Sequence, residues 1–239
     1  HLLNHYDVHT PLTSYHKYNE VEKTPYLIDQ LLLGKNIALI SDAGMPLISD
    51  PGSVLIRSCH ENGITATTVP GANAALTALS LSGADTRRFI FEGFLPQDNK
   101  EKAAVLDSLV NETRTTVFYE APHRLKKTLE ALYKALGDRP IALCRELTKR
   151  FEEVDVTTLS QAIAETDTKE PRGEYVLVLW GKDPEELKAE TRASWEAMTI
   201  AEHVAHYEAQ GLDHKAAMKQ AAADRGVSKR DIYQALLDK

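Results

Sequence analysis

Charged side chains that could take part in acid–base chemistry stand at the ends of apolar runs in the middle of the chain. Glu120 and His123 follow the run that begins at Thr115, while Arg145-Glu146 and Glu174 stand at the ends of two later runs. A carboxylate or an imidazole at the end of a buried strand can accept a proton from a substrate held beyond the sheet. Carboxylates beside arginine or lysine also form ordinary structural ion pairs, and both interpretations stay open.

Two loops built from small residues occur in the first third of the chain. The first loop, SDAGMPLISDPG, covers residues 41–52 and follows the apolar run Ile37–Ile40; the second begins at Pro70-Gly71 and follows the run Ile64–Val69. A strand that ends in a small-residue loop and opens a helix is where open α/β sheets bind ligands, because the backbone can approach closely there. We interpret the first loop as a ligand loop. For the second, close packing of a helix on a sheet explains the small residues equally well.

The C-terminal segment carries a local excess of positive charge. The whole chain has a net charge of −7, which argues against broad electrostatic attraction to nucleic acid. From Lys215 to Asp231, however, five basic residues stand against two acidic ones. The break at Gly226-Val227 has the length of a helix-turn-helix connection. This segment therefore favours a nucleic-acid contact, and the alternative is a packed helical appendage with a solvated face.

Hydrophobic periodicity indicates which elements would position these groups. Strands are predicted where short apolar runs occur, at residues 37–40, 64–69, 89–94, 115–120, 141–146, 152–158 and 175–180. Helices are predicted where apolar residues recur at helical spacing, at residues 25–33, 53–62, 72–81, 100–110, 121–136, 199–210, 213–225 and 228–237. The alternation predicts an α/β fold with two α/β domains, residues 1–84 and 85–183. A charged connector (184–194) and a small C-terminal helical domain (195–239) follow.

Composition limits the possible classes of protein. With 239 residues and 43% hydrophobic content, the chain can build two or three domains. No apolar run approaches the roughly 20 residues of a membrane span, and no signal peptide is visible. Cys59 and Cys144 lie in apolar segments, which predicts buried thiols and a reducing, cytoplasmic protein. His1, His5 and His9 have helical spacing but lack a cluster of further ligands, so no metal site is predicted.

Six motifs, in chain order, resemble the tetrapyrrole methylase superfamily and, more narrowly, its branch that methylates small-subunit ribosomal RNA: SDAGMPLISDPG, VPGANAALTALSLSG, FEGFLP, VFYEAPHRL, CRELTKRFEE and GEYVLVL. The resemblance covers nearly the whole chain. It implies S-adenosylmethionine-dependent 2′-O-methylation of a cytidine ribose, a cofactor folded into the cleft between two α/β domains, and a homodimer. The family begins with a strand and a Gly-Asn-Leu loop, and no such motif precedes His1. The resemblance therefore implies that the N-terminal strand is missing and the cofactor site incomplete.

The resemblance also implies which residues form the site. Cofactor contacts are expected from both small-residue loops and from the facing domain, namely from Asp42, Ala43, Gly44, Met45, Ile48, Pro70, Gly71, Asn73, Ala74, Tyr119, Glu120 and Leu147. For a general base, Glu120 is the first candidate and His123 the second. Basic side chains at the domain edges and in the C-terminal helices are expected to hold RNA, namely Arg124, Lys126, Lys127, Lys149, Arg150, Lys215, Lys219, Lys229 and Arg230.

Two other functions are compatible with the sequence. A methyltransferase for a tetrapyrrole or another small molecule would use the same cleft but would have no need of a basic helical tail. A non-enzymatic nucleic-acid-binding protein would use the tail and would not bind S-adenosylmethionine. Binding of the cofactor separates the second alternative from the enzymes, and the methyl acceptor separates the two enzymes.

Overall fold

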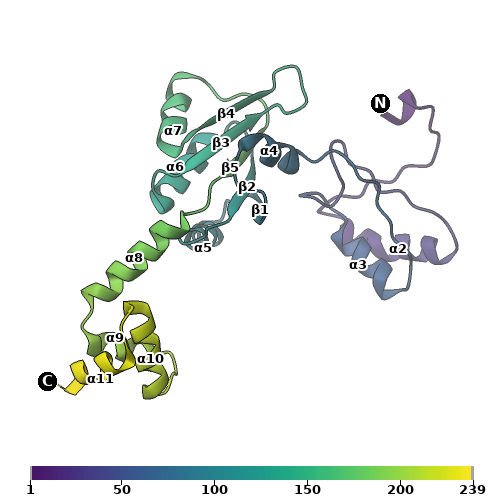
Figure 1. Cartoon of the computed structure of the whole chain (residues 1–239). Coiled ribbons are helices and arrows are strands. Elements are labelled where there is room, and N and C mark those ends of the chain that lie inside the picture. Colours follow the sequence, from purple (N-terminus) through teal and green to yellow (C-terminus); the bar gives the residue numbers. More distant parts are fainter. Residues whose placement is uncertain (1, 238–239) are drawn as a thin grey trace.

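The computed structural model describes residues 2–237, so His1 and the last two residues of the predicted helical domain lie outside the described residues. Three parts follow one another along the chain (Figure 1). An N-terminal part contains α1 (Leu2–His5), α2 (Glu20–Leu32) and α3 (Ser53–Glu61). A central sheet is flanked by helices, and the long helix α8 leads from it to a group of C-terminal helices. The fold is therefore α/β with a C-terminal helical region, as the sequence predicts.

The central sheet has five strands in the order β1-β2-β5-β3-β4. β1 and β2 are parallel, whereas β5 runs antiparallel to both β2 and β3, and β4 runs antiparallel to β3. The strands are short apolar or alternating segments, as predicted: β1 (Phe89–Phe94), β2 (Thr115–Glu120), β3 (Pro140–Arg145), β4 (Glu153–Thr158) and β5 (Tyr175–Leu179). The sheet in this half of the chain is therefore mixed.

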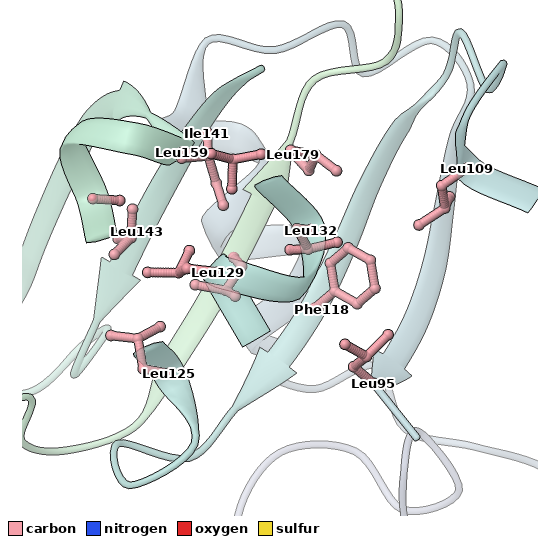
Figure 2. Packing of buried hydrophobic residues seen from close by; sticks show 12 residues of the cluster. Leu95, Leu109, Phe118, Leu125, Leu129, Leu132, Ile141, Leu143, Leu159 and Leu179 are labelled. Carbon is pink, nitrogen blue, oxygen red and sulfur yellow. The ribbon is translucent and has the colours of Figure 1, made fainter. Parts of the chain in front are cut away.

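One face of the sheet is covered by α5 (Asn99–Leu109), α6 (Leu125–Leu136) and α7 (Leu159–Thr168). Figure 2 shows the resulting core, in which Phe118 of β2 and Leu129 of α6 are fully buried. α6 forms because Leu125, Leu129, Leu132 and Leu136 recur on one face of the helix. α7 was not foreseen from the sequence; its Thr158 cap accepts a hydrogen bond from the Gln161 backbone.

The other face of the sheet is covered by α4 (Ala74–Ser82). Ala75, Ala78 and Leu79 of this helix pack on strand residues that include Val117 and Cys144. Small side chains let α4, which follows the second small-residue loop, lie close to the sheet. Close packing is therefore one role of these small residues. The sequence division at residue 84 places α4 in the first domain, whereas in the structure the helix lies on the sheet of the second.

The predicted strands 37–40 and 64–69 are absent from the described structure, and this prediction was wrong. Both segments have no strand assignment, and Ile40 and Val69 are 56% and 85% exposed. An apolar run becomes a strand only when a neighbour pairs with its backbone groups, and the sequence pattern does not report whether such a neighbour exists. Instead, α2 and α3 pack on each other through Leu27 and Leu55. α2 also begins earlier than predicted, at Glu20.

The segment predicted as a charged connector is a helix, α8 (Pro184–Ala197). Its start is well defined because Asp183 accepts a hydrogen bond from the Glu185 backbone and Pro184 occupies the first turn. Charge alone was a poor guide here, since helices between domains can be polar all round. No helix within residues 2–237 is long and apolar enough to cross a bilayer.

The three predicted C-terminal helices are confirmed as α9 (Ile200–Ala209), α10 (His214–Arg225) and α11 (Lys229–Leu237). Each begins at a predicted polar residue: Thr199 forms a capping box with Glu202, Asp213 caps α10, and Ser228 exchanges hydrogen bonds with Asp231. The helices share a small core that contains Val204, Ala217, Ala221 and Ile232.

A buried histidine joins α8 to this helical group. His203 is fully buried, stacks on Trp195 with ring centroids 4.2 Å apart, and its Nε2 lies 3.2 Å from Asp224 Oδ2. Its Nδ1 accepts a hydrogen bond from Arg225 Nε at 3.0 Å, which fits a neutral imidazole protonated on Nε2. Arg225 also donates to the carbonyls of Trp195 and Met198. The burial of His203 and the nearby Arg225 charge lower the pKa of His203.

The C-terminal helical group should therefore lose stability in mild acid. Because the pKa of His203 is lower in the folded state, the unfolded chain binds a proton first as the pH falls. The stabilisation is fully present above the ordinary histidine pKa of about 6.5 and is lost as the pH falls through the lower folded value. Denaturant unfolding at pH 7.5 and pH 5 measures this, followed by fluorescence in a Trp180→Phe background so that the signal comes from Trp195. His203→Gln should flatten the pH dependence, whereas the same change at exposed His214 should leave it intact.

Candidate functional site

The charged strand ends meet at one edge of the sheet. Tyr175, the first residue of β5, pairs with Glu120 at the end of β2 and with Arg145 at the end of β3. Phe94, which ends β1, pairs with Tyr119. Glu120, Arg145 and Tyr175 are therefore neighbours at this edge.

The two small-residue loops touch each other. A Cβ on Gly44 would lie 3.4 Å from the Ala72 carbonyl oxygen, and a Cβ on Gly71 would lie 3.4 Å from Met45 Cγ. Within the first loop, Ser41 Oγ donates a hydrogen bond to Asp50 Oδ2 at 2.7 Å. Segments that are about 30 residues apart in the chain therefore form one surface of backbone and small side chains.

The joined loops reach the strand ends through Tyr119. Ala75, in the first turn of α4, belongs to the buried cluster on which Tyr119 packs. Burial raises the pKa of this phenol, and the negative charge of Asp50 in the first loop raises it further. A Cβ on Gly93 of β1 would lie 3.3 Å from Ser49 Oγ. Leu147 packs on the same buried cluster as Tyr119. The structure thus brings both loops, Tyr119 and Leu147 to the same side of the sheet.

The remaining cofactor candidates lie within these loops. Asn73 caps α4, since its Oδ1 accepts a hydrogen bond from the Leu76 backbone at 3.0 Å. Met45 is half-buried. The other loop candidates are exposed, namely Asp42, Ala43, Gly44, Ile48, Pro70, Gly71 and Ala74.

Backbone strain is concentrated at the two segments that carry the cofactor candidates. Five described non-glycine residues have positive φ, and four of them are Leu47, Ser49, Glu146 and Thr148, with φ from 49° to 71°. The first two belong to the first small-residue loop, and the other two flank Leu147. Side chains with a Cβ rarely adopt this conformation, and such residues cluster at ligand clamps. The strain agrees with a binding role for both segments.

Hydrogen bonds to the Glu146 carboxylate hold residues 146–149 in their strained conformation. Glu146 Oε1 accepts hydrogen bonds from the Glu174 N–H at 2.9 Å and from Lys149 Nζ at 3.1 Å. These two contacts lower the pKa of Glu146, the backbone contact more than the lysine. Gly173 is required beside it, because a Cβ there would lie 2.6 Å from the Glu146 side chain. Glu146 and Lys149 therefore serve the structure of the loop.

Glu120 occupies an interior network. Its side chain is fully buried; Oε1 accepts the Ala121 N–H at 2.8 Å, and Oε2 accepts the Thr128 hydroxyl at 2.5 Å. Arg124 Nε lies 3.4 Å from Oε1. Both carboxylate oxygens accept hydrogen bonds and the side chain does not reach the surface, so in this arrangement Glu120 holds Ala121, Thr128 and Arg124 in place. His123, the second candidate, is exposed in the turn before α6.

The candidate RNA-binding cations divide into paired and exposed groups. Arg124 donates to the Leu95 carbonyl, Lys126 pairs with Asp167, and Lys149 pairs with Glu174, so these three have protein partners. Lys229 is half-buried. The others are exposed, namely Lys127, Arg150, Lys215, Lys219 and Arg230. Arg225, which contributed to the basic count of the tail, is used inside the protein.

Two residues of the FEGFLP motif were not singled out from the sequence. Glu92 lies where the register of β1 shifts, and burial raises the pKa of its carboxyl. Phe94 ends the strand and is 49% exposed. Gly93, within the predicted strand, is the signal that could have indicated this irregularity, because an isolated glycine in a strand often marks a bulge.

The sequence matches a known protein family. Residues 3–163 match the family described as Tetrapyrrole (Corrin/Porphyrin) Methylases. The chain therefore belongs to this family of methyltransferases.

Curated relatives show which members of the family this chain is similar to. The chain is 47% identical over 230 residues to "Ribosomal RNA small subunit methyltransferase I" of Bacillus subtilis (strain 168), covering 96% of this chain and 78% of the relative. A relative of the same name from Escherichia coli O157:H7 is 38% identical over 242 residues, covering 99% of this chain and 81% of its own. Both support the narrower resemblance found in the motifs.

Solved structures agree on the fold alone. A diphthine synthase has a TM-score of 0.51 and 15% identity, with 72% of this chain and 70% of that chain covered. The native uroporphyrin III C-methyl transferase of Thermus thermophilus has a TM-score of 0.51 and 16% identity, with 73% and 79% covered.

Proposed function

We propose that this chain transfers a methyl group from S-adenosylmethionine to the 2′-oxygen of a cytidine ribose in small-subunit ribosomal RNA. The observation that carries the proposal is the similarity, over nearly the whole chain, to relatives named for methylating that RNA. A tetrapyrrole or other small molecule is a weaker candidate for the acceptor, since the likeness to uroporphyrin methyltransferases is limited to the fold. Membership in a family of enzymes also disfavours a purely nucleic-acid-binding role.

Small-residue loops suit S-adenosylmethionine. This cofactor has no pyrophosphate, so a glycine-rich turn at a helix N-terminus is not needed. Backbone groups around Gly44 and Gly71 can hydrogen-bond its polar parts, while Met45, Tyr119 and Leu147 offer apolar surface. Bound there, the cofactor would supply an already activated methyl group. The protein's main task is then to align the ribose oxygen with that group, and the strained, hydrogen-bonded loops provide the necessary rigidity.

Proton removal from the ribose hydroxyl belongs to an exposed group in this proposal. His123 is exposed beside the strand end, whereas Glu120 is enclosed. Glu120 instead takes the part of a positioning residue that orients Arg124. An in-line methyl transfer depends mostly on alignment, so loss of the base has a smaller effect than loss of alignment.

RNA is held by the exposed cations of the C-terminal helices, and ribosomal RNA as substrate places the enzyme in the cytoplasm. The two cysteines, which are free and buried, suit that reducing compartment. We also assign the enzyme to a homodimer, as the motif resemblance implies. Leu76 and Leu81 of α4 are 53% and 48% exposed, and a second copy of the chain would cover such apolar surface. Sedimentation velocity tests this; a monomer at micromolar concentration contradicts it.

The proposed reaction is tested with the purified chain, S-adenosylmethionine carrying a labelled methyl group, and small ribosomal subunits from cells that lack the enzyme. Label should enter the RNA, and nuclease digestion followed by mass spectrometry should recover a 2′-O-methylated cytidine. Calorimetry should show that S-adenosylmethionine binds without RNA. Methylation of a porphyrinoid in place of RNA would overturn the assignment, as would transfer to a base.

Charge reversal in α11 should weaken RNA binding specifically. Lys229→Glu combined with Arg230→Glu removes two cations from the first turn of the helix, so fewer counterions are released when RNA binds. Affinity for small subunits should fall, and the slope of log affinity against log salt should become shallower by about two. Filter binding at several salt concentrations measures both quantities.

The matched control is Lys100→Glu with Lys102→Glu, which makes the same charge change in the first turn of α5. This control should bind subunits as the unaltered chain does, and both double variants should keep their affinity for S-adenosylmethionine. Equal losses in the two variants would mean that net charge, and not the C-terminal helices, governs RNA binding.

A further inference from the structure

A β-bulge in β1 turns Phe94 toward the candidate site. Phe91 pairs with Val117 and Phe94 pairs with Tyr119, so three steps along β1 match two steps along β2. Side chains of a regular strand alternate between faces, which would put Phe91 and Phe94 on opposite sides of the sheet. The extra residue, Glu92, cancels this alternation. Phe94 thus shares the face of Tyr119, and bulges that re-aim a side chain are common beside active sites.

Phe94 is the exposed end of an aromatic cluster. Tyr119 lies between Phe91 and Phe94, with ring centroids 5.1 Å and 5.8 Å away and edge-to-face geometry in both pairs. Phe91 and Tyr119 pack on the buried cluster beneath α4. Phe94 extends from them and is 49% exposed. A large apolar ring is therefore supported from below and open to solvent above.

The backbone after Phe94 is anchored by the interior network of Glu120. Arg124 Nη2 donates to the Leu95 carbonyl at 2.6 Å, and Arg124 Nε lies 3.4 Å from Glu120 Oε1. Leu95 itself is only 1% exposed. Phe94 thus precedes a fixed point of the chain, which limits how far its ring can move.

We propose that Phe94 is the platform on which the nucleobase of the target nucleotide stacks. The inference rests on the proposed function and adds the residue that receives the base. Phe94 stands beside Gly93, which faces Ser49 of the first cofactor loop, so a base stacked there leaves its ribose near the methyl donor. Proteins that read unpaired RNA bases stack them on aromatic rings.

A substitution series at Phe94 tests the platform. Methyl transfer to small ribosomal subunits from cells lacking the enzyme is measured for Phe94→Ala, Phe94→Leu, Phe94→Tyr and Phe94→Trp. The alanine variant should lower kcat/KM for the subunit roughly 5- to 150-fold, the range that loss of one base–aromatic stack produces. Leucine, which keeps apolar volume without a π-face, should also be impaired. Tyrosine and tryptophan should retain most activity, and calorimetry should find S-adenosylmethionine affinity unchanged throughout.

The control residue is Phe89, at the opposite end of the same strand and 37% exposed. Phe89→Leu should leave kcat/KM for the subunit within about twofold of the unaltered chain, because an exposed ring far from the site has no base to stack on. Full activity of both Phe94→Leu and Phe94→Ala would overturn the inference. Loss of S-adenosylmethionine affinity in Phe94→Leu would overturn it as well, since the ring would then belong to the cofactor site. If the unaltered chain binds S-adenosylmethionine but does not methylate RNA, the proposed function fails and this inference fails with it.

Discussion

Glu120→Ala should lower the free energy of unfolding by about 2–4 kcal/mol, because it leaves buried donors without their acceptor. The Ala121 N–H, the Thr128 hydroxyl and the Arg124 guanidinium all lose a partner. Arg124 keeps its hydrogen bond to the Leu95 carbonyl but is no longer oriented from the other side. Methyl transfer to RNA should fall together with stability, since Phe94 is then less well anchored. Urea denaturation and single-turnover methylation measure the two effects.

Glu130→Ala is the matched control for this prediction. Glu130 is on α6, its side chain is half-exposed, and its nearest cation, Lys126 Nζ, is 4.0 Å away. Such surface pairs contribute about 0–1 kcal/mol, so this variant should unfold almost as the unaltered chain does. Glu120→Gln should be intermediate, because the amide oxygen still accepts one hydrogen bond. If Glu120→Ala leaves stability intact but abolishes methyl transfer, Glu120 acts directly on substrate, and its assignment as a positioning residue is wrong.

Gly181→Ala should lower the free energy of unfolding by about 3 kcal/mol or more, because the added methyl group has no space. A Cβ at this position would lie 2.1 Å from the Thr113 carbonyl oxygen and 2.8 Å from the Arg114 backbone nitrogen. Both are backbone atoms, so no side chain can rotate away. The next residue is also fastened, because the Lys182 N–H donates to the Glu112 carbonyl at 2.7 Å. The end of β5 and the segment before β2 would have to separate.

Gly83→Ala provides the comparison. Gly83 ends α4 with a φ of 77°, and a Cβ there meets no atom within 4 Å. The free-energy cost of this substitution therefore comes from the left-handed backbone conformation alone and is about 1–2 kcal/mol. Thermal unfolding should therefore rank the chains as unaltered, Gly83→Ala, Gly181→Ala. A Gly181→Ala chain as stable as Gly83→Ala would show that the two segments are not in close contact in solution.

Local patterns predicted those elements whose partners the sequence also supplies. The leucines from Leu125 to Leu136 define α6, and the amphipathic patterns of α10 and α11 begin at the caps Asp213 and Ser228. The same logic failed for Ile37–Ile40, because an apolar run carries no information about whether a neighbouring strand is present to pair with it. It also failed for α8, where charge density predicted a connector although Asp183 and Pro184 are good helix-start residues.

The candidate site divides in the same way. Motif order and residue type led to the two small-residue loops, Tyr119 and Leu147, and the structure places them together. Residue type does not distinguish between the roles open to the charged groups. The sequence does not report what a glutamate at the end of a strand contacts. At Glu120 the carboxylate contacts an arginine and a threonine inside the protein.

By itself, the sequence determined the α/β class, the helical tail and the family, because periodicity, caps and ordered motifs are properties of the chain read along its length. Only the tertiary structure decided what each charged or aromatic side chain faces. A partner across the sheet gives Glu120 and Arg124 their interior role, and a single extra residue in β1 turns Phe94 toward Tyr119. Contacts between distant segments depend on three-dimensional packing, which is not visible in a local pattern of residue types.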